Sequence, residues 1–428
     1  MERIAVIGAG ISGLVAARTL AAAGRRVTLY EAAARAGGHA NTVDITLDGI
    51  SHGVDTGFLV FNDRTYPGLL ALFAELGVKA SEADMSFSVQ QRASGLEWAG
   101  SNLDSVFAQR ANLLRPAFWG MLADLLRFNR LCTGLARRGD ERELDEPLRD
   151  FLQRHGFGVA FRDDYLLPMV ACIWSCPPRQ MLAFPIATLI RFCHNHGLLQ
   201  ISGRPQWRSV AGGSRQYVRR ILAGLDDVRL ACPVRGVQRE AAGVRVLTDQ
   251  GGEHFDQLVF ACHSDQALAL LGEGASAEER RVLGAIRYQS NRALLHTDAS
   301  LLPRHRRAWA AWNYESAPGD EGSHVCLHYL LNRLQPLPWE RPVIVSLNPL
   351  REPDPASLLR HFDYAHPVFD RGAIQAQREL PLIQGRQASW FCGAWAGYGF
   401  HVDGLQSGLA VARAMLAGDS REPLRGAA

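Results

Sequence analysis

The chain has 428 residues, of which 47% are hydrophobic and 21% charged, and its formal net charge is +3. This composition is typical of a globular protein, and the length predicts two domains because single cores rarely exceed about 250–300 residues. The small net charge argues against nucleic acid as a partner. The sequence has one lysine, Lys79, so lysine is a poor candidate for a catalytic group.

The sequence shows no sign of a metal site, export or membrane insertion. The 8 cysteines form no CxxC pair, and neither Cys172 with Cys176 nor His194 with His196 has the further ligands of a zinc site. The N-terminus leads directly into an apolar stretch, unlike a signal peptide. The apolar run 165–178 contains prolines and is shorter than the roughly 20 residues that span a bilayer. We therefore expect a cytoplasmic protein with reduced thiols and no metal.

The first forty residues predict a dinucleotide-binding unit. Residues 3–7 form an apolar strand that runs into a GxGxxG turn, 14–23 an alanine-rich helix, and 26–30 a second strand ending at an acid. The glycines permit a tight turn and close packing, the helix N-terminus faces a pyrophosphate, and the acid binds a ribose. The residues assigned to this unit are Gly8, Gly10, Ile11, Ser12, Gly13, Glu31 and Ala32.

The next residues separate FAD from NAD. Glu31 is followed by Arg35, Gly37, Gly38 and His39 in the pattern E-x3-R-x-G-G-H. Together with the preceding turn, this pattern resembles the flavin-containing amine oxidase and phytoene desaturase superfamily. The resemblance implies non-covalent FAD, with Arg35 and the Gly37–Gly38 turn around its adenosine and pyrophosphate. His39 stands where many relatives carry arginine, and it could equally be an ordinary loop residue.

The resemblance also implies that the chain returns to the cofactor in the middle. Asp55, Thr56 and Gly57 follow a predicted strand at 50–54 and are similar to the family's turn near the isoalloxazine ring. Val234 matches the position whose backbone contacts adenine. Ala261 ends a predicted return strand of the Rossmann sheet.

A last return is implied near the C-terminus. A strand at 390–393 ends at Gly393, Ala394 follows it, and a glycine-rich loop leads to a predicted helix at 406–417. In the family, such a helix start directs backbone N–H groups to the flavin edge, which stabilises negative charge on the reduced ring. The residues that the resemblance places there are Gly404, Leu405 and Ser407.

The implied fold is α/β, with a glutathione-reductase-like Rossmann FAD domain of three layers (ββα) and an inserted substrate domain of mixed helices and antiparallel sheet. The FAD domain is expected at 1–66, 205–285 and 386–418, the substrate domain at 67–204 and 286–385, and a disordered tail at 419–428. Strands of the antiparallel sheet are predicted at 292–296, 324–331 and 343–347.

Two departures from the family weigh against amine chemistry. Ala394 replaces the glutamate of the family's G-E dipeptide, and the lysine that amine oxidases place near the flavin is absent. The segments DTGFLVFNDRTYP and GAWAGYGFHVDG resemble a bacterial subfamily of NAD/FAD-binding proteins associated with cyclopropane-fatty-acid-synthase-like methyltransferases. That subfamily includes the desaturase of furan fatty acid biosynthesis, which implies a methylated acyl chain as substrate and a lipid methyltransferase as partner. The subfamily carries glutamate where Val402 stands, so assignment to one activity stays open.

Two features of the substrate segments have alternative interpretations. Aromatic, leucine and arginine residues in 106–131 could form an amphipathic helical pair on an anionic membrane, at its cytoplasmic face. The alternative is a core helix whose arginines extend into solvent. Several aromatic side chains could line an apolar tunnel or simply form the core, namely Trp174, Phe184, Phe192, Trp207, Trp312, Tyr314 and Tyr329.

The leading functional hypothesis is an FAD-dependent oxidoreductase that desaturates a fatty acyl chain of a phospholipid. FAD supplies the two-electron chemistry, and the chain positions the substrate and excludes water. His401 and Tyr398, in the C-terminal loop, are the candidate groups for taking up a proton, or they merely pack against the flavin. The alternatives are an oxidase of amines or another small molecule, and a non-catalytic flavoprotein scaffold.

Overall fold

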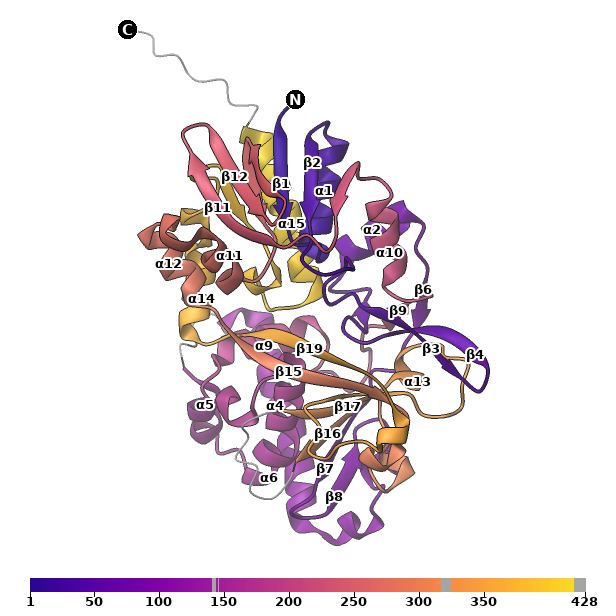
Figure 1. The fold of residues 1–428 in the computed structure, drawn as a ribbon. Coiled ribbons are helices and arrows are strands. Elements are labelled where there is room, and N and C mark those ends of the chain that lie inside the picture. The colour runs from indigo at the N-terminus through magenta and orange to yellow at the C-terminus, as the bar shows by residue number, and fades with distance from the viewer. Residues whose placement is uncertain (141–143, 145, 317–324, 419–428) are drawn as a thin grey trace.

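The computed structural model describes residues 1–140, 144, 146–316 and 325–418. The upper domain in Figure 1 is built on a five-stranded parallel sheet of order β10-β2-β1-β14-β20. Its strands are β1 (Arg3–Ile7), β2 (Arg26–Tyr30), β10 (Asp227–Arg229), β14 (Gln257–Phe260) and β20 (Ser389–Phe391). These strands come from the beginning, middle and end of the chain. Such a sheet is possible because parallel neighbours are joined by long crossover connections instead of tight turns.

Two further layers cover this sheet. Helices pack on one face, and an antiparallel sheet of order β11-β12-β13 packs on the other. Side chains alternate along β1, so Ile4 and Val6 join the helical core while Ala5 and Ile7 join the core beneath the antiparallel sheet. The elements are α1 (Ile11–Ala22), α2 (Pro67–Leu76), α10 (Arg215–Leu222), α15 (His401–Gly418), β11 (Val234–Glu240), β12 (Gly243–Thr248) and β13 (Gly251–Phe255). The predicted three-layer arrangement is confirmed.

The lower domain contains a seven-stranded sheet of order β19-β15-β18-β17-β16-β7-β8. All its neighbouring strands are antiparallel except β16 and β7. The strands are β7 (Phe87–Gln91), β8 (Leu96–Ala99), β15 (Arg287–His296), β16 (Trp312–Ser316), β17 (Cys326–Leu330), β18 (Ile344–Leu347) and β19 (Leu358–Val368). The three predicted strands are present as β15, β17 and β18, although residue 324 of the second lies outside the described residues.

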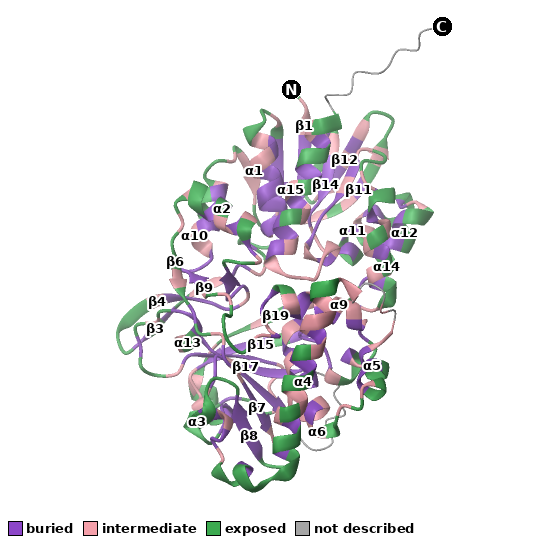
Figure 2. Cartoon of the chain, turned by 180° about the vertical axis from the view of Figure 1, so that it is seen from behind, coloured by how far each residue is buried: buried purple, intermediate pink, exposed green. Residues whose placement is uncertain are grey.

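Helices cover one side of this sheet, and Figure 2 shows their exposed outer surfaces around the buried strands. The helices of the lower domain are α3 (Leu103–Val106), α4 (Pro116–Arg138), α5 (Leu148–Arg154), α6 (Val159–Phe161), α7 (Leu167–Trp174), α8 (Pro178–Met181) and α9 (Ile186–Asn195). A further short helix, α13 (Leu331–Leu334), directly follows β17. The predicted amphipathic pair in 106–131 consists of α3, a short 3-10 turn at Arg110–Leu114 and the long α4. Within the described residues, no helix combines the length and the hydropathy needed to cross a bilayer.

Two helices of the predicted substrate domain pack in the FAD domain instead. The apolar face of α2, which follows residue 66, packs in the Rossmann core through Leu69, Leu72 and Phe73. Similarly, α14 (Arg371–Glu379) packs against α12 (Ala277–Gly284) in the upper domain. An amphipathic helix shows in its sequence that it has a buried face, but not which core buries it. The predicted tail at 419–428 lies outside the described residues.

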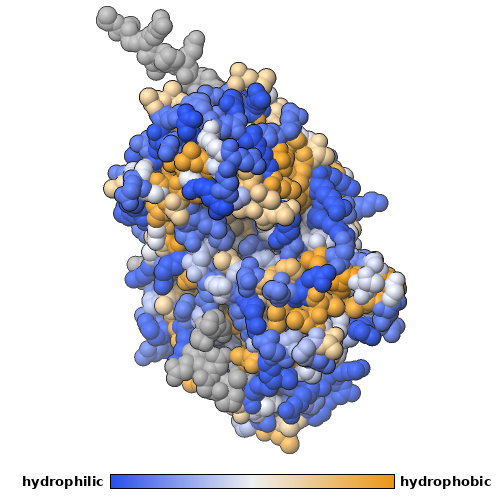
Figure 3. Space-filling model, viewed as in Figure 1, coloured by the Kyte–Doolittle hydropathy of each residue, from blue (hydrophilic) through white to orange (hydrophobic). Residues whose placement is uncertain are grey.

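The remaining elements link the two domains. A hairpin of β3 (Thr42–Leu47) and β4 (Ile50–Asp55) projects at one side, and hydrophobic residues gather over it in Figure 3. The small sheet of β5 (Phe61–Asn62), β9 (Trp207–Val210) and β6 (Ala80–Glu82) lies between the domains. In contrast, α11 (Ser264–Leu271), which follows β14, packs within the upper domain against β11 and α12.

Candidate functional site

A cavity of about 1210 Å³ extends from the GxGxxG turn into the lower domain. Typical small-molecule pockets hold roughly 300–1,000 Å³, so this one has room for a dinucleotide together with a substrate. Many predicted cofactor residues line its upper end, namely Gly8, Gly10, Ile11, Ser12, Glu31, Ala32, Gly37, Gly38, His39, Gly57, Val234, Ala261, Gly393 and Ala394. Segments far apart in the sequence therefore converge on one wall.

The glycines of the turn fit a bound pyrophosphate. Gly8 has φ +107°, and a Cβ there would lie 2.6 Å from the carbonyl oxygen of Ala261. A Cβ on Gly13 would lie 1.9 Å from the carbonyl oxygen of Gly8, so this glycine, which does not line the cavity, permits helix–strand packing. In contrast, a Cβ on Gly10 would meet no atom within 4 Å. The backbone at Gly10 thus borders open space, as close approach of a phosphate requires.

Of the two charged residues of the motif, Glu31 lines the cavity and Arg35 does not. Glu31 accepts hydrogen bonds from the backbone N–H of Ala9 at 2.8 Å and of Ala33 at 2.9 Å, which fix its carboxylate beside the turn. Arg35 is exposed and outside the cavity lining, and its Nη1 donates to the carbonyl oxygen of Gly38 at 2.9 Å. Glu31 can therefore contact a ligand directly, whereas Arg35 supports the turn.

Asp55 and Thr56 are buried behind the cavity lining. The carboxylate of Asp55 accepts hydrogen bonds from Ser214 N at 3.0 Å and from Thr42 Oγ1 at 2.6 Å, and burial raises its pKa. Thr56 Oγ1 lies 3.0 Å from the hydroxyl of Tyr364. These two residues hold the segment that brings Gly57 to the lining, so the structure gives them a supporting position.

The C-terminal helix begins earlier than predicted. It starts at His401 instead of residue 406, which places Gly404, Leu405 and Ser407 in its first two turns, outside the cavity lining. A Cβ on Gly404 would lie 2.8 Å from Ile11 Cγ2, and Leu405 is 1% exposed. Ser407 Oγ accepts a hydrogen bond from Gly393 N at 3.2 Å. These residues thus pack α15 against α1 and against the segment that follows β20. In a sequence, a glycine that permits close helix packing looks the same as a glycine that begins a helix.

The cavity lining instead includes residues 398–401, among them both candidate proton acceptors. The ring of His401 stacks on Phe58 with centroids 3.8 Å apart, and its Nε2 lies 2.8 Å from the hydroxyl of Tyr217. Burial lowers the pKa of His401 to about 3, so its ring is neutral at physiological pH. The backbone carbonyl of Tyr398 accepts a hydrogen bond from Trp174 Nε1 at 3.2 Å, which fixes the loop.

His39 meets the lower domain at the cavity wall. Its ring stacks on Tyr364 with centroids 4.9 Å apart and lies 5.2 Å from the ring of His366. Burial lowers the pKa of His39, and its Nε2 is buried without a hydrogen-bond partner among the described residues. A buried polar atom left unpaired is costly. The missing partner fits a polar group of a ligand.

The predicted aromatic tunnel is present in part. The cavity lining includes Trp174, Phe192, Trp207, Trp312 and Tyr329, whereas Phe184 and Tyr314 belong to the hydrophobic core of the lower domain. His196 also lines the cavity, and its Nδ1 lies 3.0 Å from the carbonyl oxygen of Phe192. His194 does not line it.

Sequence reasoning missed a group of lining residues outside the motifs. His263, Tyr288 and His366 all line the cavity, and the rings of His263 and Tyr288 stack with centroids 4.2 Å apart. Tyr364 and His366 are two residues apart on β19, so their side chains leave the strand on the same face. This two-residue spacing of polar aromatic side chains was the signal that the sequence offered.

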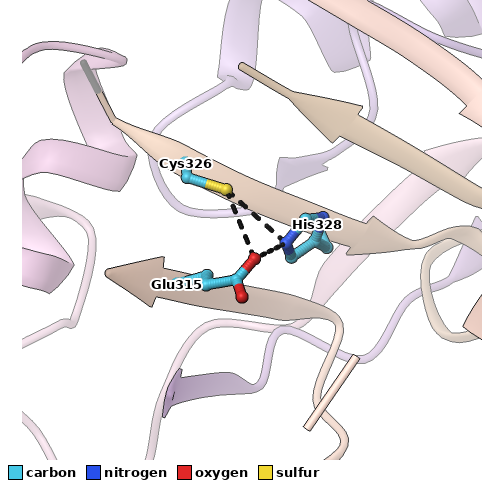
Figure 4. Close-up of side chains that lie close together, drawn as sticks. All are labelled: Glu315, Cys326 and His328. Carbon is cyan, nitrogen blue, oxygen red and sulfur yellow. Dashed lines mark hydrogen bonds and ion pairs between the residues drawn. The ribbon is translucent and has the colours of Figure 1, made fainter. Parts of the chain in front are cut away.

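A separate polar cluster lies inside the seven-stranded sheet. Glu315, Cys326 and His328 are buried with ligand atoms within 4.8 Å of one another, a spacing that could hold a metal ion (Figure 4). However, His328 Nε2 bonds to Glu315 at 2.9 Å and its Nδ1 bonds to Ser346 Oγ at 2.7 Å. Glu315 also pairs with Arg92. Glu315 and His328 are thus satisfied by each other, by Arg92 and by Ser346, and the cluster lies outside the cavity lining.

Exposed hydrophobic residues surround the lower end of the cavity. Leu103, Trp119, Leu126 and Ile201 line it and are 78%, 49%, 48% and 66% exposed. The nearby Leu113 and Leu114 are 47% and 88% exposed. We call these six residues the apolar rim. Arg204 also lines the cavity.

The family model for flavin-containing amine oxidoreductases matches residues 11–295. Over 261 residues the chain is 27% identical to the AofH protein of Mycobacterium tuberculosis, which carries the name of a flavin-containing monoamine oxidase, covering 58% of this chain and 54% of that one. It is 30% identical over 287 residues to the carotenoid phi-ring synthase of Streptomyces griseus, with 61% and 52% covered. It is 40% identical over 135 residues to the hydroxyneurosporene desaturase of Rhodobacter capsulatus, with 31% and 26% covered. The matches span about half or less of these relatives.

Solved structures show the same fold across the chain. Putrescine oxidase bound to putrescine superposes with a TM-score of 0.69 at 18% identity, covering 97% of this chain and 99% of that one. A fatty acid isomerase from P. acnes superposes with a TM-score of 0.67 at 16% identity, covering 96% and 98%. The dinucleotide end of the cavity, the mixed α/β fold and the matching family model all indicate the same family. The chain therefore belongs to the flavin-containing amine oxidoreductase family, and its cofactor is FAD.

Proposed function

We propose that the protein is an FAD-dependent oxidoreductase that removes two electrons from an apolar substrate, a fatty acyl chain of a phospholipid, and so acts as a desaturase. The observation that carries the proposal is the single cavity that joins the dinucleotide end to the apolar rim. A long chain entering at the rim can reach the cofactor without leaving apolar surroundings.

The lining favours an apolar substrate over an amine. The carboxylates among the described lining residues are Glu31 and Asp84. Glu31 is bonded to the backbone at the dinucleotide end, and Asp84 pairs with Arg333 at 2.8 Å. An ammonium group in the lower cavity would have no free carboxylate beside it, and burying an unpaired charge is costly. Acyl methylenes carry no such cost.

Bound FAD would supply the two-electron acceptor for a hydride from the substrate. The side chains of the cavity hold the acyl chain and exclude water, and forming a double bond also releases a proton from the adjacent carbon. Tyr398 and His401, which line the cavity, are the candidate groups for relaying this proton to solvent. Since the pKa of His401 is about 3, it is a weak base, and we assign it a positioning role beside Tyr217.

We further propose that the apolar rim rests on an anionic membrane. Trp119 and Leu126 on α4 are about half exposed, and Arg115 and Arg130 are exposed on or beside the same helix. An amphipathic surface of this kind binds anionic lipid through buried apolar area and phosphate contacts. A lipid methyltransferase that modifies the same acyl chain is the partner expected from the resemblance.

The first experiment follows the flavin absorbance band of the purified protein under anaerobic conditions. Vesicles of unsaturated and of methyl-branched phospholipid are added, and we expect the band to bleach with formation of a new double bond in the lipid. The variant Trp119→Ser changes the apolar rim, and Leu358→Ser is its control. Leu358 is a similarly exposed hydrophobic residue (41%) on β19, outside the cavity lining. We expect slower bleaching for Trp119→Ser alone.

Other results would redirect the assignment. An unchanged band with lipid, together with bleaching by polyamines and release of hydrogen peroxide once oxygen is admitted, would support an amine oxidase, the activity named for AofH. A band that only dithionite bleaches would support a flavoprotein scaffold.

A further inference from the structure

A chain of amide side chains leads to His366 at the cavity wall. The backbone N–H of Arg292 donates to Asn348 Oδ1 at 2.9 Å, so the other end of that amide, Nδ2, is the donor. Asn348 Nδ2 donates to Asn291 Oδ1 at 2.7 Å and to the carbonyl oxygen of Val325 at 3.2 Å. The backbone N–H of Arg292 therefore fixes the orientation of the Asn348 amide, which in turn fixes that of the Asn291 amide.

The same logic fixes the tautomer of His366. Because Asn291 Oδ1 is an acceptor, Asn291 Nδ2 is a donor, and it bonds to the carbonyl oxygen of Gln289 at 3.2 Å and to His366 Nδ1 at 2.8 Å. His366 Nδ1 must then accept, which requires it to be unprotonated. In the neutral ring the proton resides on Nε2, and this N–H is the donor left for a ligand.

The position of His366 points to the cofactor end of the cavity. His366 lies on β19 and lines the cavity, and its ring is 5.2 Å from that of His39, which follows the glycine turn at Gly37 and Gly38. A Cβ on Gly38 would lie 3.2 Å from Gly10 Cα, so this turn touches the GxGxxG loop. His366 thus faces the junction between the dinucleotide loops and the substrate region.

We propose that His366 donates a hydrogen bond from Nε2–H to an acceptor atom of the flavin ring and thereby stabilises reduced FAD. The amides of Asn291 and Asn348 hold the imidazole in the tautomer that this bond requires. Burial, with a smaller effect of His263, lowers the pKa of His366 to about 4, so the ring donates without carrying a charge. The inference rests on FAD binding and is independent of the acyl substrate.

The reduction potential of bound FAD tests the bond directly. Reduction adds electron density to the flavin, so losing a donor favours the oxidised form. We expect His366→Phe to lower the equilibrium constant for reduction about tenfold, which is about 30 mV for two electrons. The matched control is His361→Phe, on the exposed side of the same strand, and we expect it to leave the potential unchanged. An unchanged potential in His366→Phe that still binds FAD would overturn the proposal.

A second pair of measurements keeps the proposal testable if His366→Phe folds poorly. In ¹⁵N spectra of the labelled holoenzyme, we expect His366 to be protonated on Nε2 only, and an Nδ1-protonated ring would contradict the assignment. Asn291→Leu retains the imidazole but removes its anchor, and a smaller shift of the potential in the same direction would support the proposal. We expect His366→Gln, which keeps a side-chain donor, to retain most of the wild-type potential. If Asn291→Leu instead raises KM for lipid with an unchanged potential, the donor serves the substrate and the flavin assignment is wrong.

Discussion

The hydroxyl of Tyr217 lies 2.8 Å from Nε2 of His401, and the two residues join α10 to the first turn of α15 at the cavity wall. Phe58 covers one face of the His401 ring, and the two ring centroids lie 3.8 Å apart. Both titratable groups are held uncharged, because burial lowers the pKa of His401 to about 3 and raises that of Tyr217. This pair therefore positions the cavity wall without introducing charge.

The pH–rate profile follows from this arrangement. Since His401 is neutral far above its pKa of about 3, we expect no limb of the profile between pH 5 and pH 9 to belong to it. His401→Gln should lower the rate constant of flavin reduction and leave the shape of its pH profile unchanged, as measured by anaerobic single-turnover reduction. A limb in the wild type that His401→Gln removes would show that His401 titrates in turnover.

The packing of α15 against α1 depends on Gly408. A Cβ there would lie 2.2 Å from the backbone carbonyl oxygen of Ser12. We expect Gly408→Ala to destabilise the protein by about 1–3 kcal/mol through overpacking, and to weaken FAD binding because Ser12 lines the cavity. The control is Gly418→Ala at the end of the same helix, where a Cβ meets no atom within 4 Å. Thermal unfolding with and without FAD measures both effects, and equal midpoints for the two variants would refute the packing argument.

Glu31 should contribute directly to FAD affinity. Its carboxylate is fixed by the N–H groups of Ala9 and Ala33 and borders the cavity. We expect Glu31→Ala to raise the Kd for FAD by about tenfold or more, since a charge-assisted hydrogen bond contributes about 1.5–3 kcal/mol. Fluorescence titration of the apoprotein measures the Kd. The fully exposed Glu273, changed to Ala, provides the comparison, and no difference between the variants would exclude the role.

The cluster of Glu315, Cys326 and His328 should stabilise the sheet without metal. Glu315→Gln leaves the partners Arg92 and His328 without their carboxylate, and we expect a loss of about 3–5 kcal/mol in the free energy of unfolding. Urea unfolding measures this loss. Dialysis of the wild type against a chelator should leave its unfolding curve unchanged, and a chelator-induced loss of stability would instead reveal a bound ion.

Stability should fall as the pH drops below about 6.5. Burial lowers the pKa of His196 and His366 to about 4 and that of His401 to about 3, so the unfolded chain takes up protons before the folded chain does. Each of these residues contributes up to about 1.4 kcal/mol per pH unit between pH 6.5 and its folded pKa. Asp164 and Asp403, with pKa values raised to about 6, act in the opposite direction and reduce the slope. Unfolding midpoints between pH 8 and pH 5 measure the net effect, and a midpoint that rises towards pH 5 would contradict it.

The sequence alone determined the cofactor end of the protein. The strand, the turn from Gly8 to Gly13 and the acid Glu31 are within one βαβ unit, where each residue's role follows from local geometry. These features need no knowledge of distant contacts. The three-layer order of the FAD domain was implied by the resemblance to a known family, not by the local pattern, and the structure confirms it.

Only the tertiary structure decided how the substrate region meets the cofactor. His366 is 75 residues from Asn291 along the chain, and its tautomer depends on Asn348, so no local pattern could show their role. The resemblance placed Gly404 at the flavin edge, and the structure adds that its lack of a Cβ permits close packing of α15 on α1, a contact that the local sequence does not reveal. Burial and hydrogen-bond partners arise from contacts between remote segments, and a sequence encodes such contacts only through the complete fold.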